Sequence, residues 1–304
     1  MISTNLPQRT KLVAFPCLCC DRRLTEREQS CPDCETPSSL SQAVATRGEQ
    51  NHFISVLGAS NAGKTVYLGM LLDMLHKGPE SFHGIPGSSH TVDLQQQVIT
   101  ALEQRMFPEK TSAEADTWNW LHCEIARRSG NKIQHADLIC PDFAGEAIAI
   151  EISQPGLYPS IREIVGKSSG VLILCDSTSA RNRGAEEDLF AMKLATYISQ
   201  LHQSTPGTRS RGSSDRLPAV GIIFTKSDDC PDADADPKKY ASNNTPRLYD
   251  FCRRSFPELK FFAAAVAGNT AEVQGTHGSK TRIPLHLEPK GILEPVQWIL
   301  QSKG

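Results

Sequence analysis

Residues 58–65 read Gly-Ala-Ser-Asn-Ala-Gly-Lys-Thr, which fits the pattern G-x-x-x-x-G-K-[ST]. In such a loop the glycines let backbone N–H groups turn inward around phosphate oxygens, and a following helix N-terminus adds partial positive charge. A lysine at position 64 reaches the β- and γ-phosphates, and the Thr65 hydroxyl is placed to ligate Mg²⁺. The sequence therefore predicts a Mg²⁺-dependent nucleotide site. Its candidate contact residues are Gly58, Asn61, Ala62, Gly63, Lys64, Thr65 and Val66.

The segments on both sides of this loop are those that a phosphate-binding loop requires. Residues 53–57 form a short apolar run that is typical of a buried strand. Residues 66–77 are apolar nearly all round, as in a helix packed inside a domain, and Gly78-Pro79 is a helix-stop signal. Because strand, loop and helix occur in the required order, a coincidental glycine-rich turn is the weaker interpretation.

A second motif, D-x-x-G, spans Asp142 to Gly145 and lies at the end of the apolar run 136–142. The Asp142 carboxylate can hold Mg²⁺, directly or through a water, together with Thr65. The Gly145 N–H can approach a γ-phosphate because no Cβ intervenes. A solvated aspartate before a turn is the alternative, but the motif carries more weight downstream of a phosphate-binding loop.

Two further apolar runs follow, at residues 170–175 and 218–224, and the second leads into Thr225-Lys226-Ser227-Asp228. An aspartate there can accept hydrogen bonds from the N1–H and 2-amino groups of guanine, whereas adenine offers no such pair of donors. The stem of Lys226 can lie along the ring face. The tetrapeptide alone is a common surface turn, but its place after two other motifs favours guanine recognition by Thr225, Lys226 and Asp228.

Five of the ten cysteines lie close together near the N-terminus, where Cys17 with Cys20 and Cys31 with Cys34 form two C-x-x-C pairs. Two such knuckles supply the tetrahedral thiolates that suit structural Zn²⁺. A module this small cannot bury enough surface by itself, so the metal would supply folding energy. Reduced cysteines without metal are the alternative, and Cys19 has no assigned role.

Length and composition limit the remaining possibilities. The 304 residues leave room for a ribbon-like zinc module at 12–36, a polar linker at 37–50 and an α/β domain at 51–303. The formal net charge of −2 does not indicate a nucleic-acid partner. No apolar run approaches the roughly 20 residues that span a bilayer, so we expect a cytoplasmic protein without a membrane span. The large domain should be a three-layer P-loop NTPase fold with a mainly parallel sheet.

The segments GASNAGKT, DFAG, TKSD and FFAAAVAG together resemble the small-GTPase pattern of the TRAFAC class. The cysteine ribbon and the C-terminal run at residues 285–300 are similar to those of the bacterial double-GTPase (DO-GTPase) families, over about residues 12–301. This resemblance implies a GTPase that hydrolyses GTP slowly and acts as a nucleotide switch toward a protein partner in a conflict or signalling system. A nucleotide-dependent dimer is a further partner arrangement that it leaves open.

The resemblance also implies roles in catalysis, with Lys64, Thr111 and Glu146 as the candidate set. GTPases of this kind use a switch threonine to cover Mg²⁺ and the γ-phosphate. Thr111 is the candidate, with Thr91 and Thr117 as alternatives. Glu146 directly follows the D-x-x-G motif, where many GTPases carry a water-orienting glutamine. A carboxylate there could assist hydrolysis or repel the γ-phosphate, and the sequence does not decide between the two.

The fifth GTPase motif is degenerate, since Ala265 and Val266 stand near the usual Ser-Ala pair and would contact the base through backbone groups. Two other functions stay open beside the GTPase. One is an ATPase or regulatory subunit, with Asp142 or Asp176 as the acid of a Walker B motif. The other is a nucleotide-binding scaffold that does not hydrolyse, with the zinc module as its interaction surface.

Overall fold

The computed structural model describes residues 14–47, 53–108, 120–130, 132–141, 143–182, 185–203, 217–274 and 280–302. Three of the residues singled out above, Thr111, Thr117 and Asp142, lie outside these ranges. The chain divides into two compact units, Met1–Glu49 and Gln50–Gly304, which are described separately. In the described part of the chain, no helix combines the length and apolar character that a membrane crossing requires.

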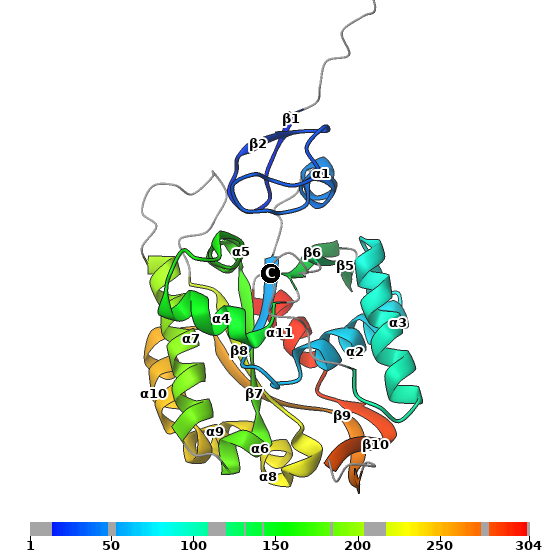
Figure 1. Cartoon of the computed structure of the whole chain (residues 1–304), viewed down its shortest axis with the longest axis vertical. Coiled ribbons are helices and arrows are strands. Elements are labelled where there is room, and N and C mark those ends of the chain that lie inside the picture. The colour runs from blue at the N-terminus through cyan, green and yellow to red at the C-terminus, as the bar shows by residue number, and fades with distance from the viewer. Residues whose placement is uncertain are drawn as a thin grey trace, which may run out of the picture. The chain divides into compact units, whose positions relative to one another are not determined.

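The first unit holds a small antiparallel pair, β1 (Ala14–Pro16) and β2 (Arg23–Thr25), followed by helix α1 (Ser38–Arg47) (Figure 1). This helix corrects the linker predicted for residues 37–50. Leu40 and Val44 are four positions apart, so they share one helix face, and both are buried. The Leu18 N–H donates to the Ser41 hydroxyl over 3.1 Å, which ties α1 to the first cysteine segment. The sequence analysis missed this helix because the segment is mostly polar and only a few apolar residues pack against the rest of the unit.

The described strands of the second unit form one eight-stranded sheet in the order β10-β9-β8-β7-β3-β6-β5-β4. The strands are β3 (Phe53–Gly58), β4 (Phe82–Pro86), β5 (Trp120–Ser129), β6 (Lys132–Pro141), β7 (Gly170–Asp176), β8 (Ala219–Thr225), β9 (Leu259–Gln274) and β10 (Lys280–Lys290). The five central strands, β9 to β6, pair in parallel, whereas both edges are antiparallel. The predicted, mainly parallel sheet is confirmed.

Helices cover both faces of this sheet, giving the three predicted layers (Figure 1). Those on one face include α2 (Lys64–His76), α3 (Ser89–Glu103) and α11 (Glu294–Ser302). Those on the other include α4 (Gly145–Ser153), α5 (Pro159–Lys167), α7 (Ala185–Gln203) and α10 (Pro246–Ser255). Every residue of β7 and β8 is buried, as expected for parallel strands covered on two sides.

The short elements α6 (Ser177–Asn182), η2 (Ser227–Asp229), α8 (Pro231–Ala235) and α9 (Pro237–Asn244) follow β7 and β8. Parallel strands end at the same sheet edge, where α/β proteins bind their ligands. The ends of β3, β7 and β8 at Gly58, Asp176 and Thr225 therefore bring the sequence motifs together at one edge of the sheet.

Candidate functional site

A cleft of about 1140 Å³ lies at this edge of the sheet, and residues of four sequence motifs line it. Of the candidate site residues, those in the lining are Asn61, Gly63, Lys64, Thr65, Val66, Gly145, Glu146, Thr225, Lys226, Asp228 and Val266. Three others do not contribute to the lining: Ala62 and Ala265 are buried, and Gly58 ends the buried strand β3. The cleft therefore unites segments that are more than a hundred residues apart in sequence.

The loop between β3 and α2 has the backbone that a phosphate-binding loop needs. Gly63 precedes α2 with φ of 79°, in the left-handed region that favours glycine. A Cβ on Gly58 would lie 2.7 Å from the Leu174 carbonyl oxygen of the neighbouring strand, so only glycine fits there. The Lys64 ammonium is buried inside the loop, where Nζ donates to the carbonyl oxygens of Gly58 (3.2 Å) and Ala59 (3.3 Å). The loop thus holds a cation at its centre.

Gly145, the first residue of α4, packs directly on this loop. A Cβ added to Gly145 would lie 2.0 Å from the Ser60 backbone nitrogen, so the close approach requires glycine. This contact with protein backbone is a reason for the glycine that the sequence motif did not reveal. The Ser60 hydroxyl donates to Oε1 of Glu146 over 2.7 Å, so the exposed Glu146 is held at the rim of the loop.

Thr225 connects the phosphate-binding loop to residues 225–228, the segment predicted to recognise the base (the base motif). Its Oγ1 lies within hydrogen-bond distance of the carbonyl oxygens of Ala62 (2.9 Å) and Cys175 (3.2 Å). Lys226 adopts the left-handed backbone conformation with φ of 57°, and its Nζ donates to Oδ2 of Asp176 over 2.5 Å. Lys226 is therefore held across the ends of β8 and β7, with its stem along the cleft.

Asp176 is a site residue whose role the sequence did not reveal. Its Oδ1 accepts from the Thr178 N–H (2.9 Å), the Thr178 hydroxyl (2.7 Å) and the Ser179 N–H (3.1 Å), as an N-cap of α6. Burial alone raises the pKa of Asp176, but the Lys226 charge and these hydrogen bonds outweigh it and hold that pKa below its usual value. The Asp-Ser-Thr-Ser run after an apolar strand was the available sequence signal.

Asp228 lines the end of the cleft at which the sequence predicts the base to bind (the base end), together with Asp229, Thr270 of β9 and Arg282 of β10. Burial raises the pKa of Asp228, and the neighbouring Asp229 raises it further, while Arg282 and Lys226 oppose both effects. Sequence reasoning missed Thr270 and Arg282 because no local pattern connects them to residues 225–228.

Thr91, an alternative switch threonine, has a structural role in α3. It is fully buried, and its Oγ1 donates to the His122 carbonyl oxygen (3.0 Å) and accepts from the His122 N–H (2.9 Å) on β5. It does not line the cleft. Thr91 is therefore not placed to cover a nucleotide, whereas Thr111 and Thr117 lie outside the described residues.

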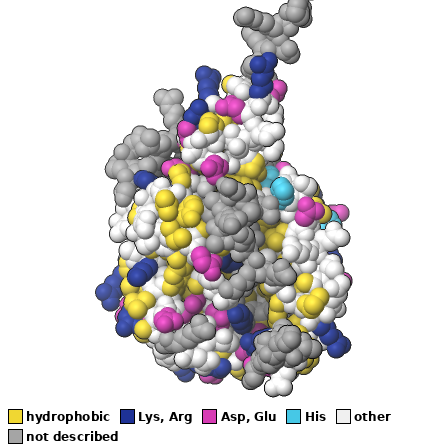
Figure 2. Space-filling model, viewed as in Figure 1, with side chains coloured by type: hydrophobic (Ala, Val, Ile, Leu, Met, Phe, Trp, Pro, Cys, Tyr) yellow, Lys and Arg dark blue, Asp and Glu magenta, His cyan; other side chains and the backbone are white. Residues whose placement is uncertain are grey.

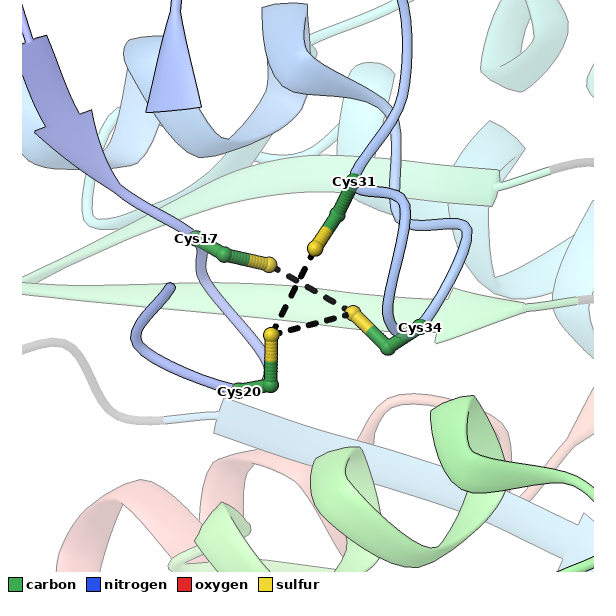
Figure 3. Close-up of side chains that lie close together, drawn as sticks. All are labelled: Cys17, Cys20, Cys31 and Cys34. Atoms are coloured by element: carbon green, nitrogen blue, oxygen red, sulfur yellow. Dashed lines mark hydrogen bonds between the residues drawn. The ribbon is translucent and has the colours of Figure 1, made fainter. Parts of the chain in front are cut away.

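In the first unit, the sulfurs of Cys17, Cys20, Cys31 and Cys34 all lie within 4.8 Å of one another (Figure 3). The two knuckles repeat the same local geometry. The Asp21 N–H donates to the Cys17 carbonyl oxygen (3.1 Å), and the Glu35 N–H donates to that of Cys31 (2.8 Å). Asp21 and Glu35 also share a left-handed backbone, with φ of 60° and 59°. The four sulfurs thus converge from two equivalent turns.

This cluster has the donor set of a closed zinc site. A hydrogen bond from Cys34 holds the pKa of Cys17 at about 4, whereas burial raises that of Cys20 to about 12. The convergence of four sulfurs within 4.8 Å of one another fits Zn²⁺. An ion pair between Arg22 and Asp33 links the two knuckles. Cys19 is buried but is not one of the four clustered cysteines.

Comparison with solved structures finds proteins of low similarity. The S. cerevisiae Ski7 GTPase-like domain, bound to GDP and inorganic phosphate, is 12% identical with a TM-score of 0.43, and the match covers 86% of this chain and 52% of that one. Methanosarcina barkeri Roco2 RocCORdC bound to GDP is 15% identical with a TM-score of 0.32, and the match covers 71% of this chain and 44% of that one. Sup35 complexed with GDP is 10% identical with a TM-score of 0.33, covering 72% and 38%. The chain thus spans about half the length of these proteins or less.

Comparison with protein families is more informative. No curated protein matches the chain. Residues 55–276, which include all four nucleotide motifs, match the Double-GTPase 1 (DO-GTPase1) family. The resemblance drawn from the motifs is confirmed, and the chain belongs to the Double-GTPase 1 family.

Proposed function

We propose that the protein is a Mg²⁺-dependent guanine-nucleotide switch that hydrolyses GTP slowly and communicates its nucleotide state to a protein partner. The observation that carries this proposal is the single cleft shared by Lys64, Gly145, Glu146, Lys226 and Asp228. The phosphate-binding loop, the D-x-x-G glycine and the base motif line one cavity, which supports the proposal that they contact one ligand. Family membership supports GTP as that ligand.

The phosphate end of the cleft is assigned to the loop at residues 58–66. Lys64, which donates to loop carbonyl oxygens, would exchange those contacts for the β- and γ-phosphates. Thr65 would ligate Mg²⁺ together with Asp142 and Thr111, of which only Thr65 lies in the described part of the chain. The metal supplies charge neutralisation of the phosphates, and the loop N–H groups orient them.

The base end of the cleft is assigned to Asp228, Lys226 and the backbone near Val266. Asp228 would accept from the N1–H and 2-amino groups of guanine. The ion pair with Asp176 would hold the Lys226 stem beside the guanine ring. Val266 lines the cleft and Ala265 does not, so Val266 is the stronger of the two proposed backbone contacts.

Slow intrinsic hydrolysis is proposed from the charges around the phosphate end. Among the described residues that line the cleft, Arg282 is the only arginine, and it forms an ion pair with Asp229 at the base end. A GTPase without an arginine at the γ-phosphate is slow, by about 10³–10⁵ in rate. A partner that placed an arginine there would accelerate hydrolysis.

An apolar surface beside Glu146 is the proposed place for the partner. Hydrophobic side chains gather over α4, α5 and α7 in Figure 2, and Ile150, Leu157 and Leu189 are exposed in this region. Movement of α4 with the state of the nucleotide would change this surface. A structural Zn²⁺ in the first unit is proposed from the four clustered cysteines, and a cytoplasmic location from the absence of a long apolar run in the sequence. A role in a conflict or signalling system and a nucleotide-dependent dimer are proposed from the resemblance.

Calorimetric titration of the Mg²⁺-loaded protein with GDP, GTPγS, ADP and ATPγS tests the proposed function. A guanine preference of about tenfold or more, equal to about 1.4 kcal/mol, is expected. Lys64→Ala should lose binding of all four nucleotides. Lys77→Ala is the matched control, because Lys77 follows the same helix, bonds to Asp73 and does not line the cleft. An adenine preference would instead favour the ATPase, and binding without any GTP turnover would favour the scaffold.

A further inference from the structure

A β-hairpin formed by β9 and β10 lines the base end of the cleft. Strand β9 does not end near Val266 but continues to Gln274 and pairs antiparallel with β10. In this register Thr270 lies opposite Pro284, and Glu272 lies opposite Arg282. Thr270 and Arg282 are thus diagonal neighbours on one face of the hairpin, and both line the cleft.

Arg282 connects this hairpin to the base motif. Its Nη2 donates to Oδ2 of Asp229, the residue that follows Asp228, and its Nε donates to the Thr270 hydroxyl over 2.8 Å. The Thr270 hydroxyl lies 3.4 Å from Oδ1 of Asp229. Arg282, Thr270 and Asp229 therefore form a closed cluster beside Asp228, with two bonds from one guanidinium group holding strand and turn together.

The charges in this cluster bear directly on guanine recognition. Asp228 must be ionised to accept from both guanine donors, but the charge of Asp229 disfavours that state. Arg282 offsets the Asp229 charge, and its side chain keeps that carboxylate on the hairpin side. Lys226 contributes a second positive charge but is bonded to Asp176. Arg282 is thus the group placed to neutralise Asp229.

We infer that Arg282 is a specificity-determining residue for the base: it clamps the β9–β10 hairpin onto Asp229 and leaves Asp228 as the carboxylate that recognises guanine. This inference deepens the proposed function and rests on it. The hairpin would then replace the degenerate fifth GTPase motif as the wall of the base site, and Arg282 acts as a positioning residue through Asp229.

The test compares the affinities of the whole protein for GDP, ADP and inorganic pyrophosphate by calorimetry with Mg²⁺ present. In Arg282→Ala, the GDP-to-ADP affinity ratio should fall about tenfold while pyrophosphate affinity stays unchanged, because only the base end is altered. In the double variant Arg282→Ala with Asp229→Asn, most of the ratio should return, since the uncompensated carboxylate is removed. Recovery of this kind would not follow from a merely structural role of Arg282.

Arg254→Ala is the matched control. Arg254 also forms an ion pair with an aspartate, Asp250, but it is on α10 and does not line the cleft. An unchanged GDP-to-ADP ratio in Arg282→Ala, or an equal loss for all three ligands, would overturn the inference while leaving the proposed function standing. A wild-type protein without guanine preference would instead overturn the proposed function itself.

Discussion

The Ser60 hydroxyl donates a hydrogen bond to Oε1 of Glu146 over 2.7 Å, and so joins the phosphate-binding loop to the first turn of α4. In Glu146→Gln an oxygen acceptor for Ser60 remains, but the negative charge is lost. Because that charge would face the γ-phosphate, its removal should raise the affinity for GTPγS about fivefold. This factor corresponds to the repulsion energy of roughly 1 kcal/mol between two unit charges a few ångströms apart in water. GDP affinity should hardly change. Titration with both nucleotides checks this, and equal changes for the two would refute it.

Gly145→Ala should disturb the same junction by steric contact. The new Cβ would meet the Ser60 backbone nitrogen at 2.0 Å, so α4 must move away from the loop. We expect at least a tenfold loss of GTPγS affinity and a lower melting temperature. Gly166→Ala in α5 is the control, since nothing lies within 4 Å of its Cβ position and alanine favours a helix. Unaltered affinity in Gly145→Ala would contradict the proposed role of this contact.

Asp228→Asn should change the preferred base. The amide offers a donor where the carboxylate accepted, so GTP affinity should fall at least tenfold, whereas xanthosine triphosphate, with an oxygen in place of the 2-amino group, should bind better than it does to the wild type. Competition binding with the two nucleotides measures the exchange. Asp232→Asn, an exposed change on the neighbouring helix α8, should leave both affinities as they are. Intact GTP affinity in Asp228→Asn would mean that the base assignment is wrong.

Asp176→Asn should lower stability in a pH-dependent manner. The pKa of Asp176 is held below its usual value, so its ionised form stabilises the fold above about pH 4, and this contribution is lost as the pH falls through the lowered pKa. The variant should lose about 0.5–1 kcal/mol of unfolding free energy at pH 7, because an ion pair with a partly exposed lysine is screened by solvent. Denaturant unfolding at pH 7 and near pH 3 should show that the difference in unfolding free energy between the wild type and the variant becomes smaller at low pH. If this difference is the same at both pH values, the ion pair is not its source.

Cys31→Ser should remove most of the zinc from the purified protein. Three thiolates and a hydroxyl hold Zn²⁺ far less well than four thiolates, and the metal supplies much of the folding free energy of so small a unit. Elemental analysis and limited proteolysis of the first unit report the two effects. Cys19→Ser is the control, because Cys19 is buried but outside the cluster. Zinc content that Cys31→Ser leaves unchanged, or that Cys19→Ser lowers equally, would overturn the four-cysteine assignment.

The sequence by itself determined the parts of this protein whose chemistry is local. The loop around Lys64, the glycine of the D-x-x-G motif and the paired cysteines are each defined by residues a few positions apart, because backbone turns and ligand knuckles are short-range structures. The buried strands β7 and β8 were equally readable, since continuous apolar runs are typical of parallel strands covered on both faces. Order along the chain then predicted the mainly parallel sheet and the family.

Only the tertiary structure decided which partners the remaining polar groups take. The Asp176–Lys226 pair joins two strand ends fifty residues apart, and the Arg282–Asp229 pair depends on the register of the β9–β10 hairpin. The sequence offered Thr91 as an alternative switch threonine, but in the structure its hydroxyl bonds to the backbone of His122 on β5. The linker expected at residues 37–50 became helix α1 because burial of Leu40 and Val44 depends on surfaces formed elsewhere in the chain. Pairing and burial of this kind depend on contacts between residues that are distant in the sequence, so no local pattern of residue types predicts them.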